Sequence, residues 1–239
     1  MIISPLISLT HTRFTVIILA GGRGSRMGVA SEYIPKSLSS IGGLRAIDYI
    51  IERHKNIAAK FIIGIGQHKD ILKAYVKGNY PSLNIEFAEE KEPESDAKSA
   101  VYCLDHANCR FPTIVVFSDL ILLGNTIIKD DTILYTNSLT KGFPGTYRYN
   151  INICDGKVEE IILQKPAKSA GVVPNFCFGN TVILKEVAYS NFSILKDFTG
   201  DIVTKYNEKI PMNAEQCEAV IEFGDQESLI KARQIWEEI

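Results

Sequence analysis

The chain has 239 residues, of which 46% are hydrophobic and 23% charged, and its formal net charge is −2. These values are ordinary for a soluble globular protein with a sizeable core, and the lack of a basic run argues against nucleic acid as the main partner. The five cysteines are scattered and form no Cys-x-x-Cys pair, so the sequence indicates neither a disulfide framework nor a thiolate zinc site. A reducing, cytoplasmic compartment is the simplest interpretation.

The first half of the chain alternates between predicted strands and helices. Its first residues are apolar, but they are too short to span a membrane and lack the basic region of a signal peptide, so we interpret them as an arm or an extra strand. Strands are expected at 16–20, 60–65, 83–88 and 113–117, and helices at 44–56, 69–77 and 96–107. This alternation predicts an α/β fold with a doubly wound, mostly parallel sheet.

The second half has shorter, alternating segments separated by turn residues. Strands are expected at 132–136, 146–153, 158–164, 175–184 and 219–223, a short helix at 200–207, and a final helix from Gln226 with Asp225 as its N-cap. The pair at 146–164 is typical of a hairpin, because Asp155-Gly156 lies between its two runs. We therefore expect a smaller antiparallel lobe facing the parallel sheet, within a single domain.

A glycine-rich stretch, residues 16–28, follows the first predicted strand directly. Glycine permits a close approach of ligand to backbone, and several amides facing one concavity suit anionic oxygens. A P-loop is excluded, because no glycine of this stretch is followed directly by a Lys-Ser/Thr pair. A dinucleotide fingerprint fits poorly, because Gly28 comes one place late and no acid follows the second predicted strand. The stretch therefore predicts a cradle for a polyphosphate.

This stretch reads Leu-Ala-Gly-Gly-x-Gly-x-Arg-Met from Leu19 to Met27, and Pro35-Lys36 follows. It resembles the signature of nucleotidyltransferases that act on sugar 1-phosphates, most of all the mannose and heptose 1-phosphate guanylyltransferase type. The resemblance implies a Rossmann-like fold in which Arg26 meets departing pyrophosphate and Lys36 approaches the nucleotide phosphates. It also implies that the loop backbone holds the nucleotide, at Leu19, Ala20, Gly21, Gly22 and Gly24.

Two acidic residues match the positions at which this family holds Mg²⁺. Asp119 directly follows the strand at 113–117, in a Ser-Asp pair where the family usually has Gly-Asp. Glu222 falls on the second metal aspartate, and its extra methylene extends its reach by about 1.5 Å. Asp225 is the alternative second ligand, or only the cap of the final helix. The resemblance thus implies Mg²⁺ as cofactor, held by Asp119 and Glu222.

The residues expected at the nucleoside and acceptor end match the family less well. Lys165, in Gln-Lys-Pro, falls where a lysine would hold the acceptor phosphate, and Asn175 falls where an asparagine would bind the sugar. Ser95 and Asp96 replace the family's Gly-Thr at the nucleotide, and Cys177 replaces a glycine. An added carboxylate at position 96 would repel phosphate.

The activity implied is transfer of a nucleoside monophosphate from an NTP to a sugar 1-phosphate or similar acceptor, with release of pyrophosphate. Residues 13–120 would be the nucleotide-binding half and residues 121–239 the acceptor-binding half. The partners would be an NTP and a phosphorylated small molecule, with no nucleic acid or membrane, while self-association stays open. Two alternatives remain: a catalytically inactive homologue that binds a nucleotide sugar, and a cytidylyltransferase for a non-sugar phosphate.

Overall fold

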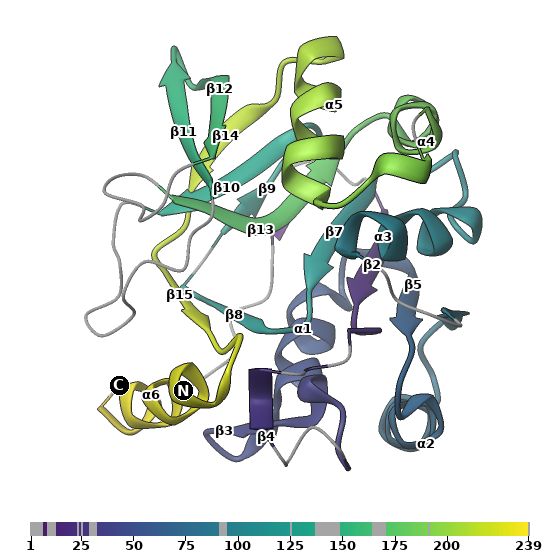
Figure 1. Ribbon diagram of the computed structural model, residues 1–239, viewed down its shortest axis with the longest axis vertical. Helices are drawn as coiled ribbons and strands as arrows, with labels where there is room; N and C mark the ends of the chain where they lie inside the picture. Colours follow the sequence, from purple (N-terminus) through teal and green to yellow (C-terminus); the bar gives the residue numbers. More distant parts are fainter. Residues whose placement is uncertain are drawn as a thin grey trace.

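A nine-stranded mixed sheet runs through the molecule (Figure 1), in the order β10-β14-β12-β11-β13-β7-β2-β5-β6. The computed structural model describes residues 7–8, 13–22, 24, 26–28, 33–90, 95–124, 126–136, 149–163, 171–190 and 192–238. The expected α/β class is confirmed, with parallel strands at one end of the sheet and mainly antiparallel pairing at the other.

The parallel part of the sheet is built from the most hydrophobic runs of the first half. Its strands are β2 (Phe14–Leu19), β5 (Ala58–Ile65), β6 (Ile85–Glu89) and β7 (Thr113–Phe117). Every residue of β2 is buried, since β5 and β7 pair with it in parallel on either side. A strand covered on both faces needs apolar side chains at successive positions, which is why this run does not alternate.

Helices cover both faces of the parallel strands. Side chains of β2 alternate between the two layers: Val16 and Ile18 pack against α1 and α2, whereas Ile17 packs against α3, α4 and the segment after it. The helices are α1 (Ala46–His54), α2 (Lys69–Asn79), α3 (Asp96–Asp105), α4 (Thr181–Tyr189) and α5 (Thr204–Lys209). In Figure 1, α3, α4 and α5 gather on one side of the sheet, as a doubly wound fold requires.

The antiparallel part joins the parallel part through β13 (Gly171–Phe178), which pairs with β7. The expected hairpin is present as β11 (Tyr149–Cys154) and β12 (Lys157–Leu163). The remaining strands of this part are β10 (Thr132–Thr136) and β14 (Asn213–Gln216).

Two expected boundaries in this half are wrong. The strand at 175–184 ends at Phe178, because the Asn180 side chain accepts hydrogen bonds from the amides of Val182 and Ile183 and so begins α4. The helix expected at 200–207 begins earlier, as a π-helical segment (η4, Phe198–Val203) that continues into α5. The Asp197 side chain caps this segment at the amide of Gly200.

A smaller unit carries the final helix to the edge of the site. Strands β8 (Leu120–Leu123) and β15 (Ala219–Glu222) pair antiparallel, and α6 (Gln226–Glu238) follows. Their apolar side chains share a third core cluster with Met27 and Tyr49. The short elements are β1 (Ile7–Ser8), β9 (Ile127–Ile128), β3 (Ser40–Ile41), β4 (Leu44–Arg45), η2 (Lys36–Leu38) and η3 (Phe192–Ile194).

Candidate functional site

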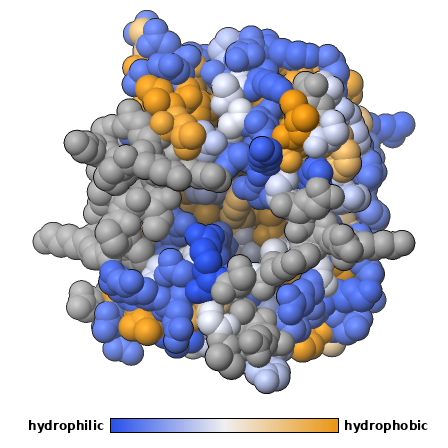
Figure 2. Space-filling view, viewed as in Figure 1, coloured by the Kyte–Doolittle hydropathy of each residue, from blue (hydrophilic) through white to orange (hydrophobic). Residues whose placement is uncertain are grey.

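A cavity of about 380 Å³ opens where β2 and β7 end, at the carboxyl edge of the parallel strands. Figure 2 shows this face of the molecule hollowed near its middle, with strongly hydrophilic side chains at the lower edge of the hollow. The lining residues are Leu19, Ala20, Gly21, Gly22, Gly24, Arg26, Lys36, Ser95, Asp96, Ser99, Phe117, Ser118, Asp119 and Gly224. Ligands of open α/β sheets bind at this edge, and the expected loop residues all line the cavity.

The backbone around Gly21 is packed too closely for a side chain. A Cβ on Gly21 would lie 2.9 Å from a Glu90 carboxylate oxygen, and a Cβ on Gly66 would lie 2.4 Å from the Gly21 carbonyl oxygen. Gly22, in contrast, faces open space. Among the described loop residues, positive φ occurs at Gly24 and Gly28 and not at Gly21 or Gly22. Glycine at position 21 is thus required by close packing.

Glu90 lies beneath this loop and is 3% exposed. Its carboxylate accepts a hydrogen bond of 2.6 Å from the Ser99 hydroxyl, and its other oxygen has no hydrogen-bond partner. Burial raises the pKa of Glu90 above its usual range, partly offset by the Ser99 hydrogen bond. Nothing in the sequence pattern indicates that the Glu90 carboxyl group packs against Gly21, so this contact could not be predicted.

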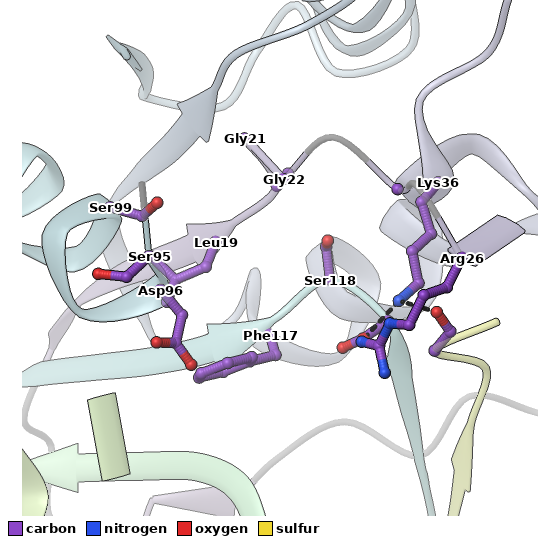
Figure 3. Close-up of a pocket in the computed structure, with 14 residues that line it drawn as sticks. Leu19, Gly21, Gly22, Arg26, Lys36, Ser95, Asp96, Ser99, Phe117 and Ser118 are labelled. Carbon is purple, nitrogen blue, oxygen red and sulfur yellow. Dashed lines mark hydrogen bonds and ion pairs between the residues drawn. The ribbon is translucent and has the colours of Figure 1, made fainter. Parts of the chain in front are cut away.

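Lys36 and Asp119 meet at one end of the cavity (Figure 3). Pro35 precedes the short η2 turn, and the Lys36 ammonium lies 2.5 Å from Asp119 Oδ2 and 3.2 Å from the Gly224 carbonyl oxygen. The Arg26 side chain lies on the same side of the cavity. The structure therefore brings Arg26 to the same end of the cavity as Lys36 and Asp119, which are themselves 83 residues apart in the sequence.

Glu222 and Asp225 have different surroundings at the same end. A Cβ on Gly224 would lie 3.6 Å from a Glu222 carboxylate oxygen and 3.9 Å from the Lys36 ammonium, so these groups converge. The Phe223 amide also donates to the Asp119 carbonyl, which fixes the two chain segments side by side. Asp225 instead caps α6, because its carboxylate accepts from the Ser228 amide at 2.8 Å. That hydrogen bond is the first cause of its lowered pKa.

The opposite end of the cavity is formed by the start of α3 and the end of β7. Ser95 caps α3 by accepting from the Lys98 amide, and its hydroxyl also donates to the Leu195 carbonyl. Asp96 accepts hydrogen bonds from the amides of Ala97 and Phe198. In Figure 3 the Asp96 carboxylate lies beside the Phe117 ring, across the cavity from Lys36. Asp96, Ser99, Phe117, Ser118 and Gly224 line the cavity, although they were not among the predicted site residues.

Of the predicted residues that the structure describes, Asn175 and Glu222 do not line this cavity. Asn175 lies in β13 opposite Val116, is 1% exposed, and neither polar atom of its side-chain amide has a hydrogen-bond partner. Lys165 lies outside the described residues. Their predicted roles remain predictions.

The described residues also limit the other candidate sites. No three histidine, cysteine, aspartate or glutamate side chains cluster as a metal site within the described part of the chain. All five cysteines are free thiols, in agreement with the expected absence of a disulfide framework. None of the described helices is both long and apolar enough to cross a membrane.

Comparison with known proteins supports the motif assignment. Residues 16–130 match the family described as the MobA-like NTP transferase domain. Over 78 residues the chain is 31% identical to D-glycero-alpha-D-manno-heptose 1-phosphate guanylyltransferase of Campylobacter jejuni, covering 32% of this chain and 35% of that protein. The match thus spans about a third of the relative's length. These matches confirm the resemblance to nucleotidyltransferases.

Solved structures of similar fold extend over nearly the whole chain. CTP:phosphocholine cytidylyltransferase of Streptococcus pneumoniae has a TM-score of 0.75 at 20% identity, covering 93% of this chain and 99% of that one. UDP-glucose pyrophosphorylase complexed with UDP-glucose has a TM-score of 0.75 at 14% identity, covering 95% and 99%. The inositol-1-phosphate CTP transferase of T. maritima has a TM-score of 0.74 at 13% identity, covering 95% and 96%. At these identities the likeness establishes the shared Rossmann-like fold.

Proposed function

We propose that this chain, whose residues 16–130 match the MobA-like NTP transferase domain, transfers a nucleoside monophosphate from an NTP to a phosphorylated small molecule. The observation that carries the proposal is the cavity itself, in which the glycine loop, Arg26, Lys36 and Asp119 surround one space. Such an arrangement suits a polyphosphate, because backbone amides and cations neutralise its oxygens.

The reaction is a displacement at the α-phosphorus of the NTP. An oxygen of the acceptor phosphate forms the new bond to that phosphorus, the bond to the bridging oxygen of the β-phosphate breaks, and pyrophosphate leaves with the electron pair. The attacking oxygen is already anionic, so no strong base is needed. The protein has to hold the reactants in line and compensate the negative charge.

We assign the two ends of the cavity to different parts of the nucleotide. Arg26 and Lys36 would contact the phosphates, and the amides near Gly21 and Gly22 would line their path. The nucleoside would lie towards Ser95 and Phe117. Residues 13–120 supply nearly all of the lining, which supports their assignment as the nucleotide-binding half. Residues 121–239 would bind the acceptor, and the roles of Lys165 and Asn175 there are proposals.

The carboxylates of Asp119 and Glu222 fit a hard divalent cation. Asp119 lines the Lys36 end of the cavity, and the Glu222 carboxylate lies close to Gly224 at that end. Carboxylate oxygens are the ligands that Mg²⁺ prefers. We propose that these two residues would hold Mg²⁺, and that Asp225 serves α6 instead. When bound, the ion would supply compensation for phosphate charge.

The acceptor is proposed only as a class. The guanylyltransferase relative favours a sugar 1-phosphate as the acceptor. With that acceptor the product would be a nucleotide sugar, and we propose the cytoplasm as the place of the reaction. Proteins with the same fold act on phosphocholine and inositol 1-phosphate, as their names state, so non-sugar phosphates form the second candidate class.

The test is pyrophosphate release from each common NTP with Mg²⁺ and a panel of acceptors: several sugar 1-phosphates, phosphocholine and inositol 1-phosphate. We expect turnover with at least one pair, and a loss of about 10²-fold or more in kcat for Asp119→Asn. Asp70→Asn, an exposed aspartate on α2, is the matched control and should turn over normally. Nucleotide binding by calorimetry without any pyrophosphate release would instead favour the inactive homologue.

A further inference from the structure

A second cavity, of about 360 Å³, lies directly behind Lys36. It is enclosed by residues 26–28, the segment around η2, the residue before α1 and one side of α6. Met27, Leu38 and Leu229 are buried and form its apolar floor, and Ile34 and Ile230 stand at its mouth, 50% and 49% exposed. A mainly apolar cavity of this size, with few polar groups, is typical of a site for a small organic ligand.

Two arginines give this second cavity a positive rim. Arg45 donates from its guanidinium to the Leu38 carbonyl at 3.1 Å, and Arg233 donates from Nε to the Ser40 carbonyl at 3.0 Å. Both thus hold fixed positions, and neither forms an ion pair with a carboxylate of the described residues. Among the described residues, no acidic side chain lines the cavity.

The acid nearest to Arg45 in sequence is engaged elsewhere. Asp48 accepts hydrogen bonds from the Tyr75 and Tyr80 hydroxyls, at 2.7 and 2.8 Å, and from the Arg45 backbone amide. Asp48 thus forms no ion pair with the Arg45 guanidinium, which also lies within reach of the Tyr75 hydroxyl. A guanidinium group is charged and carries several N–H donors in a fixed, planar arrangement. This arrangement suits hydrogen bonds to phosphate oxygens.

We infer that the second cavity binds a nucleoside phosphate, with the base on the apolar floor and the phosphates at Arg45 and Arg233. The need for an anion with an apolar body follows from the cavity alone. The choice of a nucleoside rests on the proposed function, because an NTP-using enzyme meets such molecules and the second cavity is about as large as the first.

Lys36 forms a wall of both cavities. Its ammonium lies in the first, bonded to Asp119 and Gly224, so the second ligand would contact its aliphatic stem. A ligand that packs against this stem restricts the movement of the ammonium. Occupancy of the second cavity is therefore expected to change the affinity of the first for its nucleotide.

The test is calorimetric titration of the full chain with each of five nucleoside diphosphates, without divalent cation or acceptor. We expect about two molecules bound per chain for at least one nucleotide. The double variant Arg45→Gln, Arg233→Glu should lose one of them, with its Kd raised at least tenfold. Arg110→Gln, an exposed arginine outside either cavity, is the matched control and should retain both sites.

Three results would overturn the inference. One is a stoichiometry of one for every nucleotide in the wild-type chain, and another is two sites surviving in the double variant. The third is arginine-dependent binding of 1-anilinonaphthalene-8-sulfonate, an apolar anion, without second-site binding of any nucleotide. Because no turnover is measured, failure of the proposed activity would be seen separately, in the pyrophosphate assay.

Discussion

Gly66 allows a direct test of whether the position of the glycine loop controls nucleotide binding. Gly66 lies just after β5 and does not line the first cavity. It packs against the carbonyl of Gly21, which does line it. In Gly66→Ala the new Cβ would lie 2.4 Å from that oxygen, whereas ordinary contact begins at 3.4 Å. The two must separate by 3.4 − 2.4, or about 1 Å. Glu90 also packs closely against Gly21, which leaves the loop little room to adjust there.

We expect Gly66→Ala to weaken nucleotide binding at least tenfold, about 1.4 kcal/mol, and to lower turnover by up to about 10²-fold. Overpacking of this kind also costs about 1–3 kcal/mol of stability, measured by urea unfolding. Gly78→Ala on α2 is the control, since a Cβ there meets nothing within 4 Å. It should bind normally and gain up to about 1 kcal/mol from better helix propensity. If Gly66→Ala folds and binds nucleotide as tightly as the wild type, the loop position does not control binding.

Two further predictions concern stability. Burial, with a smaller effect of the Arg53 charge, lowers the pKa of His54 to about 4, although the hydrogen bond between its Nδ1 and the Ile50 carbonyl opposes the shift. Below pH 6.5 the unfolded state then binds more protons than the folded state, so this contribution to stability is complete above pH 6.5 and is lost as the pH falls towards 4. At pH 5 the expected loss of unfolding free energy is about 2 kcal/mol. In urea unfolding at pH 7.5 and pH 5, His54→Gln should show a smaller difference between the two pH values than the wild type. Asp225→Ala should lower the free energy of unfolding by about 1 kcal/mol, because it removes the cap of α6. Asp225→Asn keeps an acceptor for the Ser228 amide and should lower it less. Equal losses for the two variants in thermal melts would contradict the capping role.

The sequence was most informative where local pattern and long-range packing agree. The parallel strands could be predicted because their apolar runs are stable only when both faces of the strand are buried, as in β2, where every residue is buried. Asp119 could be expected at the carboxyl edge of the sheet, because it closely follows the strand β7. Lys36 was expected near the nucleotide phosphates only from the family resemblance, and the structure places its ammonium 2.5 Å from Asp119.

Contacts that depend on side-chain direction were not predictable. The apolar residues on both sides of Asn180 continue a strand pattern, and only its cap shows that α4 begins there. The choice between Glu222 and Asp225 stayed open in the sequence, because both precede the same helix. The structure separates them by the Ser228 amide, which occupies the Asp225 carboxylate. Likewise, Glu90 could not be recognised as the group beneath Gly21.

Asp96 bears on whether the site is catalytic, because a carboxylate added to a phosphate site argues for an inactive homologue. Its position weakens that argument. The Asp96 carboxylate accepts from the Phe198 amide at 3.1 Å, which ties it to the start of η4. It also lies beside Phe117, at the opposite end of the cavity from Lys36 (Figure 3). Repulsion weakens with distance and is screened in solvent, so a charge at the nucleoside end opposes the phosphates little. Asp96→Ala should therefore have a KM for the NTP within about threefold of the wild-type value, a difference of less than about one kcal/mol. A much larger fall in KM would mean that Asp96 does repel the phosphates.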